Sequence, residues 1–231
     1  MGTQTEPTTE VKKTSKNYHD TLDESIAKMK LTFSNASLPQ IFAVMVTVGY
    51  TAEKIAALNS ELAQLETLSQ GQIKEYADQS SEQKKFSDKH DEINAVFNKD
   101  RALLRILFKG NIHAWVALKL DGENPKAIDA WTALLNNFYA QLTNSSDLLT
   151  AASGVGVNKR SVDAQLKALA DLEILKQSLR KETSEAQSAT DARDTAFDAL
   201  YPKYTEYIKY AKVLLPDNQA LEAIGVKVKA K

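Results

Sequence analysis

Residues 161–215 read SVDAQLKALADLEILKQSLRKETSEAQSATDARDTAFDALYPKYTEYIKYAKVLL, and the spacing of their side chains decides the fold. Helix-facing positions recur there at alternating intervals of three and four residues, at Leu179, Thr183, Ala186, Thr190, Arg193, Phe197, Leu200, Tyr204, Tyr207, Ala211 and Leu214. Residues 51–109 follow a similar pattern. Such a seven-residue repeat is typical of a long α-helix that packs along another helix. The sequence therefore predicts two long helices.

Shorter helical patterns accompany each long one. Residues 22–33 have the spacing of an amphipathic helix, and Pro39 begins a short helix after them. The same two elements recur at 128–142 and 148–152, and an apolar segment, 112–120, follows the first long helix. Sliding the chain along itself by 110 residues, or by 107 at its end, aligns the two halves. This self-similarity predicts a tandem duplication.

The predicted fold is all-α, an elongated helical bundle built from a tandem duplication, in which two long helices pair with shorter flanking helices. We divide the chain into a disordered N-terminal tail (1–17), a first helical repeat (18–120), a second helical repeat (121–226) and a basic C-terminal tail (227–231).

Two features of the long stretches leave alternatives open. Each stretch is either one unbroken helix or a hairpin that turns near residues 78–82 and 188–191, where polar residues offer caps. Neither place has a glycine or proline, which favours the unbroken helix. Pro202 removes one helical hydrogen bond, and because the heptad pattern continues past it we expect a kink there rather than a stop.

Four segments carry a resemblance to a known family: GYTAE at 49–53, ATDARDTAFDAL at 189–200, YTEYIKYAKV at 204–213 and LEAIGV at 221–226. Together they resemble a bacterial family of duplicated helical proteins that has no assigned function. The resemblance implies a duplicated all-α fold and offers no catalytic residue. The chain departs from the family's pattern at residues 201–203, where a proline interrupts a plain helix.

Composition excludes several classes of function. The 231 residues include 29 lysines and arginines against 30 acids, and the balance holds in both halves, so neither half has the basic character of a nucleic-acid-binding domain. The sequence has no cysteine, which excludes disulfide scaffolds and thiolate metal sites. The N-terminal residues lack the pattern of a secretory signal, and we therefore expect a cytoplasmic protein.

Polar clusters give no convergent catalytic site. His90 lies among Asp88, Asp91 and Glu92, which is the pattern of a metal site but more often that of a charged helix face. A second acidic set, Asp191, Asp194 and Asp198, has ion-pair partners close by in the sequence. The glycine-containing loop that precedes the second long helix lacks the spacing of a phosphate-binding loop. We therefore predict no catalytic residue, no cofactor and no metal, and a protein that is not an enzyme.

The leading hypothesis is a non-enzymatic helical structural or scaffold protein that acts through protein–protein contacts, with self-assembly as one form. Tyrosines at every third position cannot all lie on one buried stripe, so we expect a partner surface among Tyr201, Tyr204, Tyr207 and Tyr210. The partner is another protein or a second copy of the chain, and not a nucleic acid.

Two alternative functions stay open. One is membrane interaction of the pore-forming type through the apolar segment 41–48, with Ile41, Phe42, Met45 and Val46 as its membrane element. The segment is too short to span a bilayer as a helix. The other alternative is a helical bundle that binds a small ligand in its core.

Overall fold

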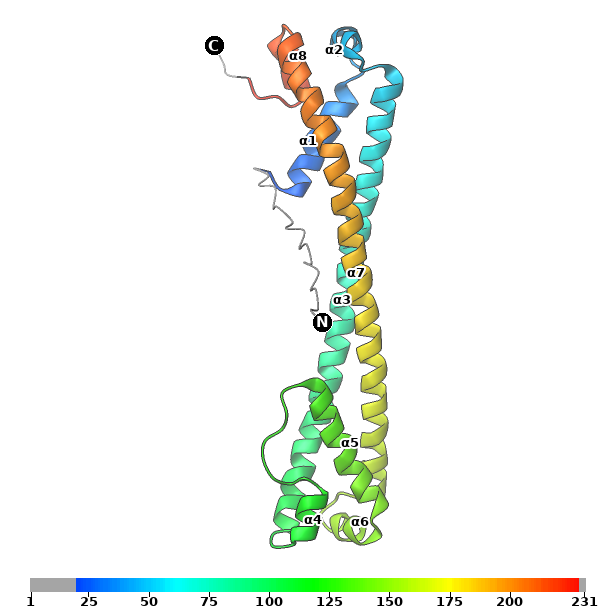
Figure 1. Ribbon diagram of the computed structural model, residues 1–231, viewed down its shortest axis with the longest axis vertical. Helices are drawn as coiled ribbons and strands as arrows, with labels where there is room; N and C mark the ends of the chain where they lie inside the picture. Colours follow the sequence, from blue (N-terminus) through cyan, green and yellow to red (C-terminus); the bar gives the residue numbers. More distant parts are fainter. Residues whose placement is uncertain (1–19, 229–231) are drawn as a thin grey trace, which may run out of the picture. The chain divides into compact units, whose positions relative to one another are not determined.

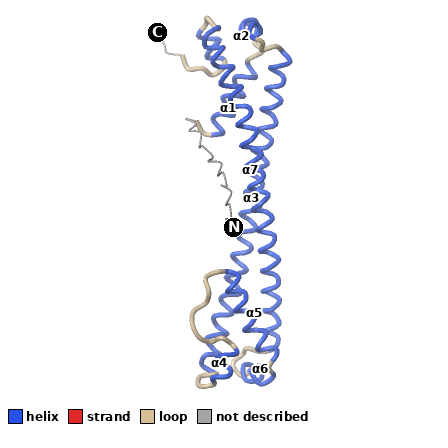
Figure 2. Tube along the Cα trace, in the orientation of Figure 1, coloured by secondary structure: helices blue, strands red, loops and turns tan. Residues whose placement is uncertain are grey.

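The structure of the chain is a computed structural model that describes residues 20–228 (Figure 1). Every regular element within these residues is a helix, which confirms the all-α class (Figure 2). The predicted tail at 1–17 lies outside the described residues, as do positions 229–231 of the predicted basic tail.

Medium, short, long and short helices follow one another twice along the chain. The first series is α1 (Leu22–Asn35), α2 (Pro39–Met45) with the 3-10 helix η1 (Val46–Val48), α3 (Ala52–Leu107) and α4 (Ile112–Ala117). The second series is α5 (Ile128–Asn144), α6 (Ser146–Ser153), α7 (Lys159–Leu214) and α8 (Asn218–Ala223). This order is the one that the sequence predicts, whereas the duplication behind it stays a prediction.

The two long helices, α3 and α7, are unbroken, and each has 56 residues. The hairpin alternative does not form. Both helices begin at side-chain caps: the Lys54 amide donates to Thr51 Oγ1 at 3.3 Å, and Asn158 and Ser161 exchange hydrogen bonds between amide and side chain at 3.0 and 3.1 Å. Helix α7 continues through Pro202, so the proline does not stop it.

The equal lengths align the ends of α3 and α7 at a spacing of 107 residues, whereas the sequence predicts 110 for the helix interiors. Buried side chains coincide at this spacing, in the pairs Ile55 and Val162, Leu62 and Leu169, Leu65 and Leu172, Ile93 and Leu200, and Leu104 and Ala211. The three-residue difference is close to one helical turn, which is why periodicity alone did not separate the two alignments.

The described part of the chain forms two compact units, residues 20–68 with 194–228 (unit 1) and residues 69–193 (unit 2). Unit 1 contains α1, α2, the first part of α3, the last part of α7 and α8. Unit 2 contains α5, α6, the first part of α7, the last part of α3 and α4. Each unit thus combines elements from both predicted repeats, 18–120 and 121–226. The two units therefore divide the chain in a different way from the two repeats.

Aromatic rings from both ends of the sequence fill the core of unit 1. The Tyr207 ring meets the Tyr50 and Phe33 rings edge to face, at centroid distances of 4.8 and 6.2 Å. Tyr50, just before α3, contacts Tyr207, whereas Glu61, further along α3, pairs with the earlier Lys203 of α7 at 2.7 Å. The two helices therefore run antiparallel here. Helix α1 is tied to the C-terminal segment because Thr32 Oγ1 donates to a carbonyl just after α8 at 2.8 Å.

The core of unit 2 lies where α5 covers α3 and α7. Phe97 and Phe138 pack edge to face at 5.1 Å, and Tyr139 packs on Phe138 at 5.0 Å. Trp131 is buried with them, and its Nε1 donates to the Asn94 side chain at 3.3 Å. Figure 1 shows α4 and α6 at the end of this unit where α3 finishes and α7 begins.

Candidate functional site

Helix α4 carries aliphatic side chains on two opposite faces. Ala114 and Leu118, one turn apart, are fully buried in unit 2. Ile112 and Val116 lie on the opposite face, with 79% and 67% of their surface exposed. Together with the half-buried Trp115 they form what we call the α4 surface. A short helix that is apolar on both faces exposes apolar area that its own fold does not cover.

Helix α8 occupies the corresponding place in unit 1 and shows the usual solution. Its buried side chains, Ala220 and Ile224, have the same spacing as those on the inner face of α4. Its outward positions are polar, Asn218 and Glu222, and both are exposed. The outer face of α4 is therefore apolar, whereas the outer face of α8 is polar, as is usual for a helix face in contact with water.

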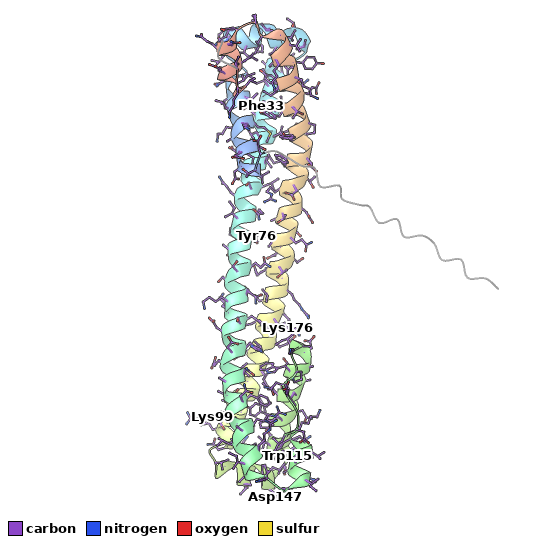
Figure 3. All side chains as sticks on the ribbon, turned by 90° about the vertical axis from the view of Figure 1, so that its left-hand side faces the viewer. Phe33, Tyr76, Lys99, Trp115, Asp147 and Lys176 are labelled. Carbon is purple, nitrogen blue, oxygen red and sulfur yellow. The ribbon has the colours of Figure 1, made fainter. Side chains whose placement is uncertain are left out.

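A shallow hollow of about 290 Å³ adjoins the α4 surface. It is lined by Lys109, Gly110, Asn111, Ile112, Trp115, Val116 and Asp121. Ile106, in the last turn of α3 just before it, is 77% exposed. Figure 3 shows Trp115 and Asp147 at the same end of unit 2.

Two arginines of α3 hold the loop behind α4 in place. Arg101 Nη2 donates to the carbonyl oxygens of Lys119 and Asp121 at 2.9 and 2.6 Å, and its Nη1 donates to the Asn124 side chain at 2.7 Å. Arg105 donates from Nε and Nη2 to two further carbonyls of this loop at 2.6 and 2.8 Å. These charge-assisted hydrogen bonds fix the loop, and the Trp115 indole donates to the Asp121 carboxylate.

Burial shifts the pKa of the ionisable groups beneath this surface. It raises the pKa of the Asp100 carboxyl. The Tyr139 hydroxyl donates to Asp100 Oδ2 at 3.1 Å, and this hydrogen bond opposes the increase in pKa. Burial also raises the pKa of Tyr139, and it lowers the pKa of the neighbouring Arg101. These groups lie inside the core rather than on the exposed surface, so they support the fold of unit 2.

Unit 1 has a second exposed apolar area at the end of α7. Val213 is 81% exposed and Tyr210 is 41% exposed, one turn apart on the same helix face. With Val48 and Leu214 they form what we call the α7 surface. These four residues, with Glu206 and Lys209, line an open hollow of about 440 Å³. The negative charge of Glu206 adds to burial in raising the pKa of Tyr50 beneath it to about 12.

The structure separates the four tyrosines of the predicted partner surface. Tyr207 is fully buried in the core of unit 1, and burial raises its pKa to about 12, so it offers no partner surface. Tyr201 and Tyr204 are half-buried, and their rings lie 5.9 Å apart. Only Tyr210 is exposed, and it belongs to the α7 surface. The burial of Tyr207 follows from its aromatic neighbours, which come from α1 and from the residues just before α3.

The predicted membrane element is largely built into unit 1. Ile41 and Met45 are fully buried, Phe42 is half-buried, and Val46 is exposed. Ile41 and Met45 are therefore core residues and are not available on the folded surface. In the described part of the chain no single helix is long and apolar enough to cross a membrane, although α1 together with 39–48, bent by 91°, passes the same test as a broken pair.

The polar clusters considered from the sequence lie at the surface. His90 Nδ1 lies 3.1 Å from Asp91 Oδ1, and the His90 ring lies 4.5 Å from the Trp131 ring. Asp191, Asp194 and Asp198 are exposed on α7. The loop before α7 ends in the Asn158 cap and supplies the start of a helix.

One charged cluster in unit 2 was not predicted. Carboxylate oxygens of Glu75, Glu182 and Glu185 lie within 4.8 Å of one another across α3 and α7. Lys181 pairs with Glu185 at 2.9 Å and lies 3.4 Å from Glu182. Lys74, next to Glu75 on α3, pairs with Asp78 at 2.9 Å. The ammonium groups balance these carboxylates, and we interpret the cluster as a network of surface ion pairs.

Sequence reasoning missed the α4 surface. The signal was present, because the apolar run at 112–120 has no polar side at helical spacing.

Comparison of the chain with protein-family models, with curated proteins and with solved structures gives no match in any of the three searches.

Proposed function

We propose that this chain is a non-enzymatic structural protein that acts through protein–protein contacts made at its α4 and α7 surfaces. The observation that carries the proposal is the exposure of Ile112, Val116 and Val213, each two thirds exposed or more. Contiguous exposed apolar areas commonly mark contact sites in soluble proteins. Full burial of one such side chain contributes about 1.5–3 kcal/mol, so two or three of them can support a specific contact.

The fixed geometry of the α4 surface supports the same proposal. Arg101 and Arg105 hold the loop behind α4 with five hydrogen bonds. A contact surface that is already ordered loses little conformational freedom when a partner binds.

Of the alternatives raised from the sequence, membrane insertion through 41–48 is disfavoured because Ile41 and Met45 are core residues. Ligand binding in the core stays a hypothesis. We extend the proposal to a cytoplasmic location, which cell fractionation tests.

A capture experiment tests the proposed function. The wild type and a variant with both surfaces changed, I112N/V116E/V213D, are immobilised, and the retained proteins, the chain itself included, are compared quantitatively. We expect binding to the wild type that the variant loses. I174S is the matched control, because Ile174 is 66% exposed on α7 outside both surfaces. Equal retention by the wild type and the surface variant contradicts the proposal.

A further inference from the structure

The α4 surface belongs to a stretch of sequence that carries cations and no acids. Residues 101–120 include Arg101, Arg105, Lys109 and Lys119 and contain no aspartate or glutamate. The whole chain, by contrast, is balanced, with 29 lysines and arginines against 30 acids. Positive charge is therefore gathered along the same segment that exposes the aliphatic side chains of α4.

Two lysines of this stretch flank α4 and are exposed. Lys109 comes shortly before the helix and Lys119 shortly after it. Within residues 20–228 neither of these two ammonium groups makes an ion pair. Along the chain, the exposed Ile112 and Val116 are thus bracketed by two cations that can bind an outside partner.

Asp121 also lines the hollow of the α4 surface, and its charge acts inward. Its carboxylate accepts the hydrogen bond of the Trp115 indole. Burial lowers the pKa of Arg101, and the negative charge of Asp121 opposes this decrease, so the carboxylate is partnered by the buried guanidinium. Asp121 therefore leaves the charges of Lys109 and Lys119 uncompensated.

The neighbouring segments at this end of unit 2 add no net charge. In the loop behind α4 after Asp121, in α6 and at the start of α7, three acids stand against three cations, namely Glu123, Asp147 and Asp163 against Lys126, Lys159 and Arg160. Figure 3 shows Asp147 at the same end as Trp115. The excess of positive charge from residues 101–120 therefore persists at this end of the unit.

The apolar side chains of the α4 surface project outward. Ile112 is 79% exposed and Val116 is 67% exposed, and the hollow beside them is shallow. Projecting aliphatic side chains suit a fluid bilayer, which adapts to them, whereas a folded protein must offer a matching recess. Trp115, half-buried beside them, is of a residue type that is enriched at the level of lipid headgroups.

We propose that the α4 surface binds a membrane surface that carries anionic lipids. Ile112 and Val116 enter the boundary between headgroups and acyl chains, while Lys109 and Lys119 lie among the anionic headgroups. The contact is peripheral, and it uses no residue of the segment 41–48. It goes beyond the proposed function, because it adds a lipid partner to the α4 surface, and protein contacts at the α7 surface do not depend on it.

Vesicle flotation with the purified full-length chain tests the proposal. We expect the wild type to float with phosphatidylcholine–phosphatidylserine vesicles and to bind vesicles of phosphatidylcholine alone much more weakly. Raising the salt concentration should weaken the binding, because salt screens the attraction between lysines and headgroups. Brominated phosphatidylcholine in the anionic vesicles should quench the fluorescence of Trp115, and W115F should lose this quenching.

Two variants separate the apolar and charged parts of the contact. I112N/V116E, which gives α4 the outward residues of α8, should weaken binding about tenfold or more. K109Q/K119Q should weaken binding to the anionic vesicles about five-fold for each lysine. All four side chains are exposed, so unchanged circular dichroism spectra and melting temperatures are expected.

Matched controls change similar side chains elsewhere in unit 2. I174S removes an exposed aliphatic side chain from α7, and K99Q removes an exposed lysine from α3. Both controls should bind the anionic vesicles like the wild type.

Several results overturn the proposal. They are a wild type that floats with neither kind of vesicle, equal binding to neutral and anionic vesicles, and undiminished binding by I112N/V116E or by K109Q/K119Q. Loss of protein capture by K109Q/K119Q, without any vesicle binding by the wild type, assigns the surface to an acidic protein instead.

The two proposals fail separately. If the wild type binds no vesicles but the capture experiment shows binding that needs the α4 and α7 surfaces, only the lipid contact is wrong. If anionic vesicles bind as expected but the wild type and I112N/V116E/V213D retain the same proteins, the proposed function is wrong and the lipid contact stands.

Discussion

At the scale of single residues, Arg101 is a buried charge that orders the loop behind the α4 surface without being part of that surface. Its guanidinium holds the loop of Lys119 and Asp121 through their carbonyls. We expect R101A to lower the free energy of unfolding of unit 2 by about 2–4 kcal/mol, since charge-assisted hydrogen bonds are lost and a cavity opens. Urea unfolding followed by the tryptophan fluorescence of unit 2 measures the loss. K99A, an exposed change on the same helix, should alter stability by about 0.5 kcal/mol or less, and equal effects of R101A and K99A would contradict this role.

The neighbouring Asp100 gives the stability of unit 2 a pH dependence. Burial raises its pKa in the folded state. A carboxyl with a raised folded pKa stabilises the fold most below its unfolded pKa of about 3.9, and this contribution is lost as pH rises through the folded pKa. D100N keeps an acceptor for the Tyr139 hydroxyl and removes the ionisation. We expect D100N to gain stability relative to the wild type as pH rises from about 4 to about 7, measured by urea unfolding across that range. A growing advantage of the wild type would contradict the expectation.

At the scale of the helices, α7 has an internal proline and α3 has none. Pro202 of α7 aligns with Ala95 of α3 at the spacing of 107 residues, and both are exposed. A proline inside a helix costs about 3 kcal/mol through a lost hydrogen bond and a steric clash. We expect P202A to stabilise unit 1 by about 1–3 kcal/mol and A95P to destabilise unit 2 by about 3 kcal/mol or more. Thermal and urea unfolding of both variants give the comparison. Destabilisation by P202A would show instead that the packing of unit 1 requires the helix shape that the proline imposes.

Helix boundaries were predictable because they depend on neighbours in sequence. The periodicity located α3 and α7 to within a few residues, and Pro39 and Gly49 marked the start and end of a short helical segment, where Gly49 adopts a φ of 84°. The burial of individual side chains was less predictable, because it depends on contacts between distant segments. Tyr204 and Tyr207 both stand at the helix-facing spacing, and Tyr210 does not, which agrees with the exposure of Tyr210. The pattern does not distinguish Tyr207, which Phe33 and Tyr50 bury, from the half-buried Tyr204. The exposed face of α4 is a different case, because the apolar run at 112–120 indicated it locally and was interpreted only as a short apolar segment.

At the scale of the whole molecule, two separate cores predict two regions of local stability. Leu135 is fully buried in unit 2, and L135A should leave a cavity that costs about 2–5 kcal/mol. We expect amide hydrogen exchange in α5 and α6 to accelerate strongly, whereas exchange in α1 and α2 should change much less. The matched variant I41A, in the core of unit 1, should give the opposite pattern. Equal acceleration in both units by either variant would mean that the chain unfolds as one cooperative body.

The central claim is that the chain acts through protein contacts made at its exposed α4 and α7 surfaces. The most direct test is the capture experiment with the wild type, the surface variant I112N/V116E/V213D and the control I174S. The account predicts that the wild type and I174S retain a partner that the surface variant loses. Equal retention by the wild type and the surface variant would contradict it.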